Sequence, residues 1–271
     1  MRTEMAVIRT LATTAFVALL PLLAAQTDCN AGAGPLKHDA LSNQPDIIAK
    51  FAANEALFKE QRTRYSYHED FVAETLRPVG PPGQTVVDGR YRQIMDVSYD
   101  QHGNRVERVS FAPQSTMRRI TMTRDDFDDV HIYAAFVLTP DVVPHYNFHY
   151  EGRQQVDELD TYVFEVAPVE TLKGKRYFQG RIWVDVSDIA IVKTCGKTVP
   201  DIIIPSNKKK GMETIHPTFV TYRQAVDGKY WFPAYTRSDD DLVFRNNPVM
   251  LREVVKFTDY HPTPPNVPAY R

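Results

Sequence analysis

The chain has 271 residues, of which 43% are hydrophobic and 24% are charged, an ordinary composition for a globular protein. This length suits one large β domain or two small ones. The net charge of −2 gives no electrostatic reason to expect a nucleic acid or an acidic membrane surface as partner, so neither is predicted. The one basic run, three lysines at 208–210, has the length of a solvated loop.

Residues 1–25 have the pattern of a signal peptide. A start containing arginines is followed by an apolar stretch at 11–25, which is too short for a typical membrane-spanning helix. Ala24 and Ala25 are small residues that suit cleavage, so we expect the mature chain to begin near Gln26. The protein is therefore predicted to be exported, to a bacterial periplasm or in association with the envelope. An uncleaved anchor is the alternative, which N-terminal sequencing would distinguish.

The two cysteines, Cys29 and Cys195, both follow the expected cleavage point. In an oxidising compartment such a pair often forms one disulfide, while two unpaired small apolar side chains are the alternative. Lipidation of Cys29 is not expected, because a lipoprotein signal has small apolar residues directly before its cysteine and this chain has Gln26-Thr27-Asp28.

Residues 26–43 are rich in Ala, Gly, Asn and Asp, and we expect them to form a flexible leader. Asn43 is then expected to cap a helix that carries Pro45 and Asp46 in its first turn, where both residue types are favoured. The helix is predicted to end near Arg62. Its apolar face consists of Ile47, Ile48, Phe51, Leu57 and Phe58.

Alternating side chains with many β-branched and aromatic residues predict a series of antiparallel strands. These strands cover residues 64–76, 86–99, 106–111, 117–122, 146–154, 159–167, 177–184, 189–193, 218–226, 229–237 and 250–260. Asp227-Gly228 is a strong hairpin signal, because both residues tolerate positive φ. The three acids at 239–241 are expected to form an exposed turn. About ten consecutive strands predict a single, strongly curved antiparallel sheet.

Between residues 123 and 143 the apolar period changes from two to that of a helix. Thr123 and Asp126 resemble a capping box, and the apolar residues that follow at helical spacing are Phe127, Val130, Ala134 and Val137. This pattern predicts a helical insertion that covers one face of the sheet as a lid. We expect a single domain over residues 44–261 and a Pro-rich tail over 262–271 that does not fold on its own.

The sequence contains no Gly-rich phosphate loop and no nucleophile elbow. His145 and His149 have the best metal-like spacing, since strand positions four apart share a face, but no third ligand can be identified. We therefore predict no metal, no cofactor and no catalytic residue, and a protein that is not an enzyme. A metal-dependent enzyme that uses these two histidines is an alternative that elemental analysis would test.

The chain has a surplus of aromatic residues, with 14 Tyr, 14 Phe and 2 Trp. A sheet that curls without closing has more concave apolar surface than one helix covers, so an apolar ligand or a movable element is expected there. An ordinary core is the alternative for most of these side chains. The candidate lining residues are Phe51, Phe58, Tyr65, Tyr67, Phe71, Tyr162, Phe164, Phe178 and Ile182, and Trp183 is assigned to the same apolar face.

Several segments resemble the LolA-like group of periplasmic lipoprotein carriers and outer-membrane lipoprotein-sorting proteins. They are YNFHYEG at 146–152, TYVFEV at 161–166, and FQGRIWVD at 178–185 followed by IVK at 191–193. The resemblance covers roughly residues 45–260. It implies a mainly β fold with helices, in which a half-open β-barrel is covered on its concave face by an N-terminal helix and an inserted helical lid. It further implies an apolar cavity for acyl chains and no catalytic residue.

These expectations combine into a non-enzymatic periplasmic carrier or binder of lipid or lipoprotein acyl chains. A lipoprotein-trafficking protein of the inner or outer membrane is the expected protein partner. The alternative is an envelope-stress sensor or scaffold, which uses the same fold to bind a protein.

Overall fold

The computed structural model describes residues 26–81, 83–122, 127, 136–200, 216–244 and 247–263. The expected signal peptide, most of the expected lid, the polar loop at 201–215 and residues 264–271 of the Pro-rich tail lie outside these ranges. No helix within the described ranges has the length and apolarity needed to cross a membrane.

The N-terminal helix α1 spans Gln44–Arg62, which confirms the predicted helix. Pro45 and Asp46 lie in its first turn, and Lys59 and Arg62 lie in its last turn, as the helix dipole favours. Asn43 occupies the N-cap position, but its side chain makes no capping hydrogen bond, so that part of the prediction is wrong. The buried residues of α1 are Ile47, Phe51, Ala52, Glu55 and Phe58.

Ten antiparallel strands form one sheet in the order β3-β2-β1-β10-β9-β8-β7-β6-β5-β4. Their bounds are β1 Tyr65–Pro78, β2 Thr85–Tyr99, β3 Arg105–Phe111, β4 Tyr146–Val156, β5 Leu159–Pro168, β6 Tyr177–Asp185, β7 Ile191–Val199, β8 Phe219–Val226, β9 Tyr230–Phe244 and β10 Asn247–Pro262. Strands β4 to β10 follow one another as a meander. The pairing of β1 with β10 joins this meander to the β1–β3 hairpins.

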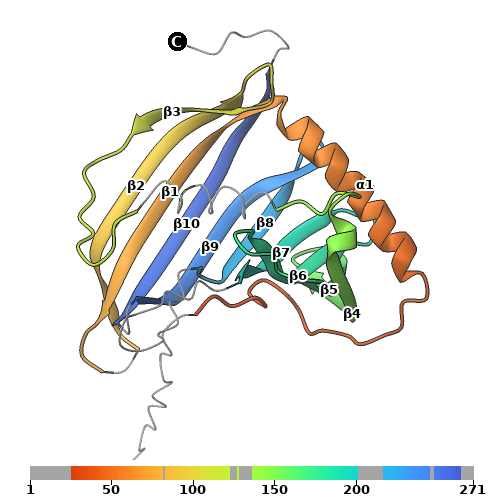
Figure 1. Ribbon diagram of the computed structural model, residues 1–271, viewed down its shortest axis with the longest axis horizontal. Coiled ribbons are helices and arrows are strands. Elements are labelled where there is room, and N and C mark those ends of the chain that lie inside the picture. The colour runs from red at the N-terminus through yellow and green to blue at the C-terminus, as the bar shows by residue number, and fades with distance from the viewer. Residues whose placement is uncertain are drawn as a thin grey trace, which may run out of the picture.

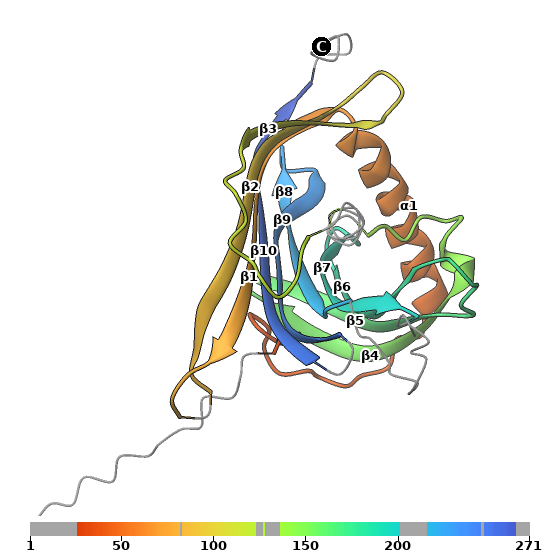
Figure 2. The same ribbon diagram turned by 60° about the vertical axis from the view of Figure 1, so that its left-hand side comes forward.

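The sheet is strongly curved, and α1 lies across its concave side (Figure 1). Strands β3 and β4 are its two edges, so the sheet is open, and a second view shows that it wraps only part of the way around its interior (Figure 2). This architecture fits the predicted half-open barrel with an N-terminal helix over the concave face. We call the concave side the inner face and the convex side the outer face.

Two strands are longer than predicted. β7 continues through Cys195 to Val199, and β9 continues beyond Arg237 to Phe244. The acids at 239–241 therefore lie in a strand, and their prediction as an exposed turn is wrong. Asp239 is buried, and its carboxylate is compensated there by hydrogen bonds that it accepts from Arg237 at 2.5 Å and from Arg252 at 2.7 Å. The hairpin at Asp227-Gly228 is confirmed, with φ of 54° and 63° at the two residues.

The predicted strand at 117–122 is also wrong, because residues 112–122 have no regular secondary structure. Of the expected helical lid, Phe127 has a helical conformation, while 123–126 and 128–135 lie outside the described residues. The lid is thus not confirmed as a helix. A 3-10 helix, η1, spans Val143–His145 directly before β4.

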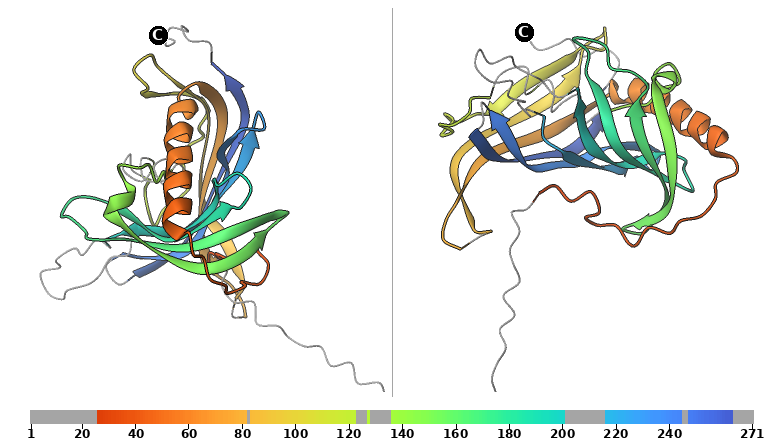
Figure 3. Two further views of the ribbon diagram at one scale, coloured as in Figure 1. Left: turned by 90° about the vertical axis from the view of Figure 1, so that its right-hand side faces the viewer. Right: turned by 60° about the horizontal axis from the view of Figure 1, so that its bottom comes forward.

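The expected flexible leader is instead attached to the sheet. Gly34 and Lys37 donate backbone hydrogen bonds of 2.8 Å to the edge strand β4, and Thr27 hydrogen-bonds the backbone at Asp239. The leader runs along the outer face before it turns into α1 (Figure 3). We call residues 26–39 the strap. The composition of this segment predicted flexibility. In the folded chain, however, β4 is an edge strand with unpaired backbone groups, and the strap pairs with these groups and covers the edge.

Candidate functional site

All nine candidate lining residues lie on the inner face. Three apolar clusters on this face contain them, and each cluster is named here by its position. The α1 cluster contains Ile47, Phe51, Ala52, Leu138, Phe164, Val166, Phe178, Ile182, Val184, Ile191 and Phe219, with Tyr162 packed at its margin. The β1–β2 cluster contains Tyr67, Phe71, Ala73, Met95, Val97, Leu242, Leu251, Val255 and Phe257. The helix-end cluster contains Phe58, Tyr65, Val226 and Phe232.

The α1 cluster is closed by interlocking aromatic rings. The ring of Phe51 lies 5.9 Å from that of Phe148 and 6.1 Å from that of Phe164. The segment that precedes η1 adds Phe136, which stacks on Phe178 with ring centroids 4.4 Å apart. Such ring pairs stabilise packing beyond the area that they bury. This part of the inner face is a tightly packed core under the helix.

A buried ion pair fixes α1 to the sheet. Glu55 on the helix and Arg223 on β8 have side chains that are each 2% exposed, with nitrogen–oxygen distances of 2.6 and 3.1 Å. Arg223 also donates to the carbonyl oxygen of Phe136 at 2.7 Å and lies 4.7 Å from the ring centre of Phe58. The pair therefore joins the helix, the sheet and the segment before η1. The helix period places Glu55 on this buried face, four residues after Phe51 and three before Phe58, although the predicted apolar face contained only hydrophobic residues.

The β1–β2 cluster has a different cover. The buried side chains of β1 and β2 meet residues of the segment 112–122, namely Met117, Ile120 and Met122, together with Phe127. The ring of Phe127 lies 5.5 Å from Phe71 and 5.3 Å from Tyr91. We call 112–122 with Phe127 the cover segment. It supplies flexible methionine side chains, which adapt to neighbours of different shape.

Among the described residues, Thr116 and Arg119 attach the cover segment to the sheet by hydrogen bonds. Thr116 exchanges hydrogen bonds with the backbone of Arg90 at 2.9 Å. Arg119 donates to the carbonyl oxygen of Leu76 at 2.5 Å and pairs with Asp88 at 3.0 Å. Gly89 permits the close approach, since a Cβ atom there would lie 2.7 Å from the Cα atom of Met117. These contacts are few and partly exposed, so the cover segment is less firmly attached than α1.

A charged group lies within the β1–β2 cluster. Glu69 is fully buried and pairs with Arg105 on the edge strand β3 at 2.8 Å. The Arg105 guanidinium also donates to the Tyr67 hydroxyl and lies 5.8 Å from the centre of that ring. Burial holds the pKa of Tyr67 well above its usual range. Tyr67 is therefore a neutral phenol at physiological pH.

The outer face carries a fourth apolar cluster, which the sequence analysis missed. This outer cluster contains Val156, Val163, Trp183, Val192, Cys195 and Val220. Trp183 was assigned to the inner face, which is wrong, because its neighbour Ile182 faces inward and strand side chains alternate. The strap covers this cluster with Cys29, Ala33 and Leu36.

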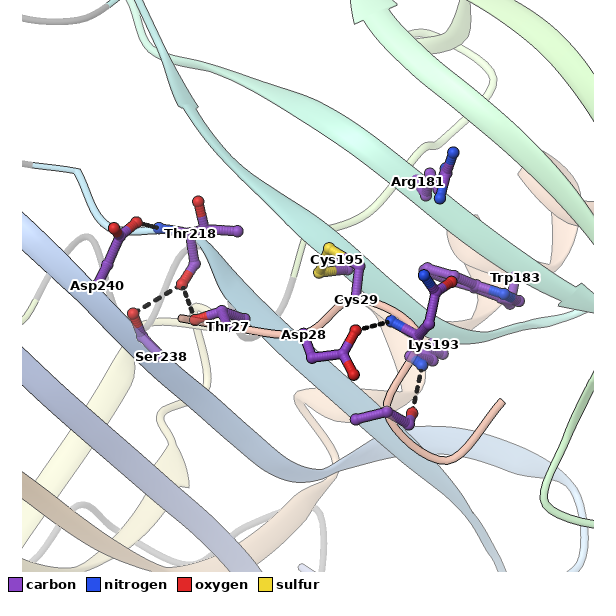
Figure 4. The surroundings of a disulfide bond; sticks show 12 residues. Thr27, Asp28, Cys29, Arg181, Trp183, Lys193, Cys195, Thr218, Ser238 and Asp240 are labelled. Carbon is purple, nitrogen blue, oxygen red and sulfur yellow. Dashed lines mark hydrogen bonds between the residues drawn. A yellow bond between two sulfur atoms is a disulfide. The ribbon is translucent and has the colours of Figure 1, made fainter. Parts of the chain in front are cut away.

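The disulfide between Cys29 and Cys195 ties the strap to β7 (Figure 4). Beside it, Lys193 is fully buried, donates to the carbonyl oxygen of Ala31 at 2.7 Å, and lies 4.6 Å from the ring centre of Trp183. Burial lowers the pKa of Lys193 to about 8. The predicted cysteine pairing is thus confirmed, and a buried cation accompanies it.

The two candidate metal-binding histidines are not brought together on one strand. His145 ends η1 and His149 lies in β4, and both are exposed. Within the described ranges, no group of three or more His, Cys, Asp and Glu side chains has the arrangement of a metal site.

Comparison with known proteins found similar solved structures. A DUF1329 family protein from Desulfovibrio piger is 14% identical, with a TM-score of 0.34, over 79% of this chain and 93% of that chain. A putative outer-membrane lipoprotein-sorting protein domain from Vibrio parahaemolyticus is 10% identical, with a TM-score of 0.32, over 79% and 92%. A LolA superfamily protein from Nitrosomonas europaea is 12% identical, with a TM-score of 0.30, over 80% and 95%.

No family model and no curated protein sequence matches the chain. The LolA-like group that the sequence resembles is thus also represented among the solved structures found.

Proposed function

We propose that this protein binds lipid or lipoprotein acyl chains on its inner face and carries them without catalysis. The observation that supports the proposal is the cover of the β1–β2 cluster. A second sheet would close an apolar face permanently, whereas here a segment without regular structure lies on it, held by Thr116 and Arg119. Such a cover can move while the ten strands keep their pairing.

Tyr67 and Phe71 are the best candidates among the nine proposed lining residues. The ring of Phe71 contacts Phe127 of the cover segment, so displacement of the segment would expose this ring to a ligand. Tyr67 belongs to the same cluster and lies four residues earlier on β1, where a bound chain could extend. Phe51, Phe164 and Phe178 lie under α1, where ring packing and the Glu55–Arg223 pair oppose displacement. We therefore propose that an acyl chain first enters over β1 and β2. The other candidates would line the site only if the chain extends beneath the helix.

The driving force would be burial of acyl methylene groups, each contributing about 0.8 kcal/mol. The chain would replace the side chains of Met117, Ile120 and Met122, which lose their contacts when the cover segment moves. Affinity would therefore equal the gain from the acyl chain minus the cost of displacing this cover. Release would follow when a competing apolar surface accepts the chain and the cover segment returns.

The disulfide supports the proposed location in the periplasm. Structural disulfides persist in oxidising compartments, and Cys29 with Cys195 forms one here. The proposed export through residues 1–25 would deliver the chain to such a compartment.

Native mass spectrometry of protein purified from its own envelope would test the proposal. Co-purifying lipid is expected. A stoichiometric protein partner without lipid would instead support the sensor or scaffold function and contradict the carrier.

A binding assay on the delipidated protein would locate the site. We expect Phe71→Ala to weaken binding of a fluorescent acyl-chain probe, because the ring faces the proposed chain position. The matched control is Val87→Ala on β2, whose side chain is 47% exposed and should not matter. Equal effects of the two substitutions would contradict the proposed site, provided that both variants keep the native circular dichroism spectrum.

A further inference from the structure

The arginines of the described residues follow a rule with one exception. Those that are buried or half-buried pair with a carboxylate, except Arg62. The pairs are Arg92–Asp70, Arg105–Glu69, Arg153–Asp160, Arg181–Glu151, Arg223–Glu55, Arg237–Asp239 and Arg252–Asp239. Arg62 is half-buried and has neither an ion pair nor a side-chain hydrogen bond with any described residue. Its Nε atom is buried without a hydrogen-bond partner.

Aromatic rings surround the Arg62 guanidinium. Its central carbon lies 5.7 Å from the ring centre of Phe58 and 5.9 Å from that of Tyr99. Ring faces stabilise a cation, but they accept no in-plane hydrogen bond, so the buried Nε–H donor of Arg62 gains no acceptor from them. Arg153 and Arg223 also have a buried Nε atom without a partner, but each of them pairs with a carboxylate. Arg62 therefore differs in its charge balance, and an oxyanion would supply the neutralising group that the other two already have.

The location of Arg62 connects it to the proposed acyl site. It is the last residue of α1, near the meeting point of the helix-end cluster and the β1–β2 cluster. Tyr260 packs against both of these clusters, and Tyr99 packs against the β1–β2 cluster. An arginine at a helix C-terminus is also favoured by the helix dipole. An interaction with the helix dipole does not require a buried side chain, however. The exposed Arg64 and Lys59 lie at the same helix end and can make that interaction, so the dipole does not explain why Arg62 is half-buried.

We propose that the ligand of the inner face is an anionic amphiphile, whose carboxylate or phosphate head group binds Arg62 while its acyl chain lies over β1 and β2. The inference rests on the proposed acyl-chain binding and adds the charge of the ligand. The planar guanidinium presents parallel N–H donors that match both oxygens of a carboxylate or two oxygens of a phosphate. Tyr99 and Phe58 would hold the guanidinium in place from its faces.

The test compares dodecanoate with dodecanol, which share a chain length and differ in head-group charge. Binding to the purified full-length protein is measured by displacement of a neutral fluorescent probe, below the concentration at which either compound aggregates. We expect dodecanoate to bind about tenfold more tightly than dodecanol, the scale of one charge-assisted hydrogen bond. Arg62→Gln should remove this preference, and Arg62→Lys should keep part of it.

Arg64→Gln is the matched control, because it removes one positive charge only two residues from Arg62. The Arg64 side chain is 62% exposed and pairs with Glu60. It should leave the preference unchanged. Equal binding of the two compounds by the native protein, or an unchanged preference in Arg62→Gln, would overturn the inference. If Arg62→Gln does not fold, the native protein and Arg62→Lys still decide, because full retention of the preference in the lysine variant contradicts a bidentate contact.

Two further outcomes separate this inference from others. If neither compound binds, the proposed acyl-chain function itself fails. If inorganic phosphate displaces dodecanoate as effectively as dodecanoate displaces the probe, Arg62 binds a free oxyanion and the amphiphile is the wrong ligand class.

Discussion

The inner face of this sheet is covered in two ways. Over the α1 cluster, a helix of 19 residues buries aromatic side chains and is fixed by the Glu55–Arg223 pair. Over the β1–β2 cluster, the cover segment 112–122 with Phe127 has few attachments, and most of its anchoring atoms are near solvent. One half of the curved sheet thus lies under a helix with a buried ion pair, and the other half lies under a segment without regular secondary structure. The free energy of opening should therefore differ between the halves.

The largest expected difference comes from removing one ring from each cover. Phe51→Ala should reduce the free energy of unfolding by roughly 3–5 kcal/mol, because the ring is fully buried among Phe148 and Phe164. Phe127→Ala should cost about 1 kcal/mol, since its ring contacts lie in the detachable half. Urea unfolding measures both values. Similar costs for the two substitutions would mean that the cover segment belongs to the core.

The buried ion pair gives the next largest effect. Glu55→Gln leaves the Arg223 charge buried without its carboxylate and should cost about 3 kcal/mol in the same assay. Glu60→Gln removes a carboxylate from the same helix, but its partner Arg64 is 62% exposed, so its cost should be below about 1 kcal/mol. An equally small cost for Glu55→Gln would show that α1 is held by its rings alone.

The sequence predicted the elements that have a clear period. α1 and the ten strands follow from apolar spacing, although β7 and β9 are longer than predicted, and the Asp227-Gly228 turn follows from the need for positive φ. β9 was cut short because three consecutive acids at 239–241 resemble a turn. In the folded chain Asp239 pairs with Arg237 and Arg252, and tertiary contacts of this kind are invisible to a local pattern.

The face of most candidate lining residues could be predicted because a strand places every second side chain on one side. By the same rule Trp183 faces outward, because it follows Ile182, which faces inward, so its prediction on the inner face conflicts with strand alternation. What covers each face could not be predicted. Residues 112–122 carry apolar side chains at Met117, Ile120 and Met122, yet they lie on the sheet as an irregular segment that bonds the backbone of β2 at Arg90 alone, beyond the end of the β2–β3 pairing.

A change of pH can separate stability of the sheet from opening of its cover. The pKa of Lys193 is lowered to about 8 by burial, so in the window between 8 and its ordinary value of 10.5 the unfolded chain binds more protons than the folded chain. Stability should therefore rise with pH in this window, by roughly 2 kcal/mol between pH 7 and 9.5. Lys193→Met should remove the rise in urea unfolding.

This pH effect lies on the outer face, so it should not change acyl-probe binding at the inner face. The tyrosines act in the opposite direction at higher pH, because burial raises the pKa of Tyr65 to about 12 and its ionisation destabilises the fold. A fall in stability from pH 7 to 9.5 would contradict the lowered pKa of Lys193.

The smallest expected change in stability tests the attachment of the cover segment directly. Arg119→Gln removes the contacts with the Leu76 carbonyl oxygen and Asp88, and should cost less than about 1 kcal/mol because the pair is partly exposed. Its effect on opening should nevertheless be clear, since few other contacts hold residues 112–122. We expect faster amide hydrogen exchange at 112–122 and faster probe association, with no change under α1.

Arg118→Gln, an exposed neighbour, should alter neither rate. Exchange that accelerates equally in α1 would show that the two halves of the inner face open together, and the proposed entry over β1 and β2 would then lose its basis.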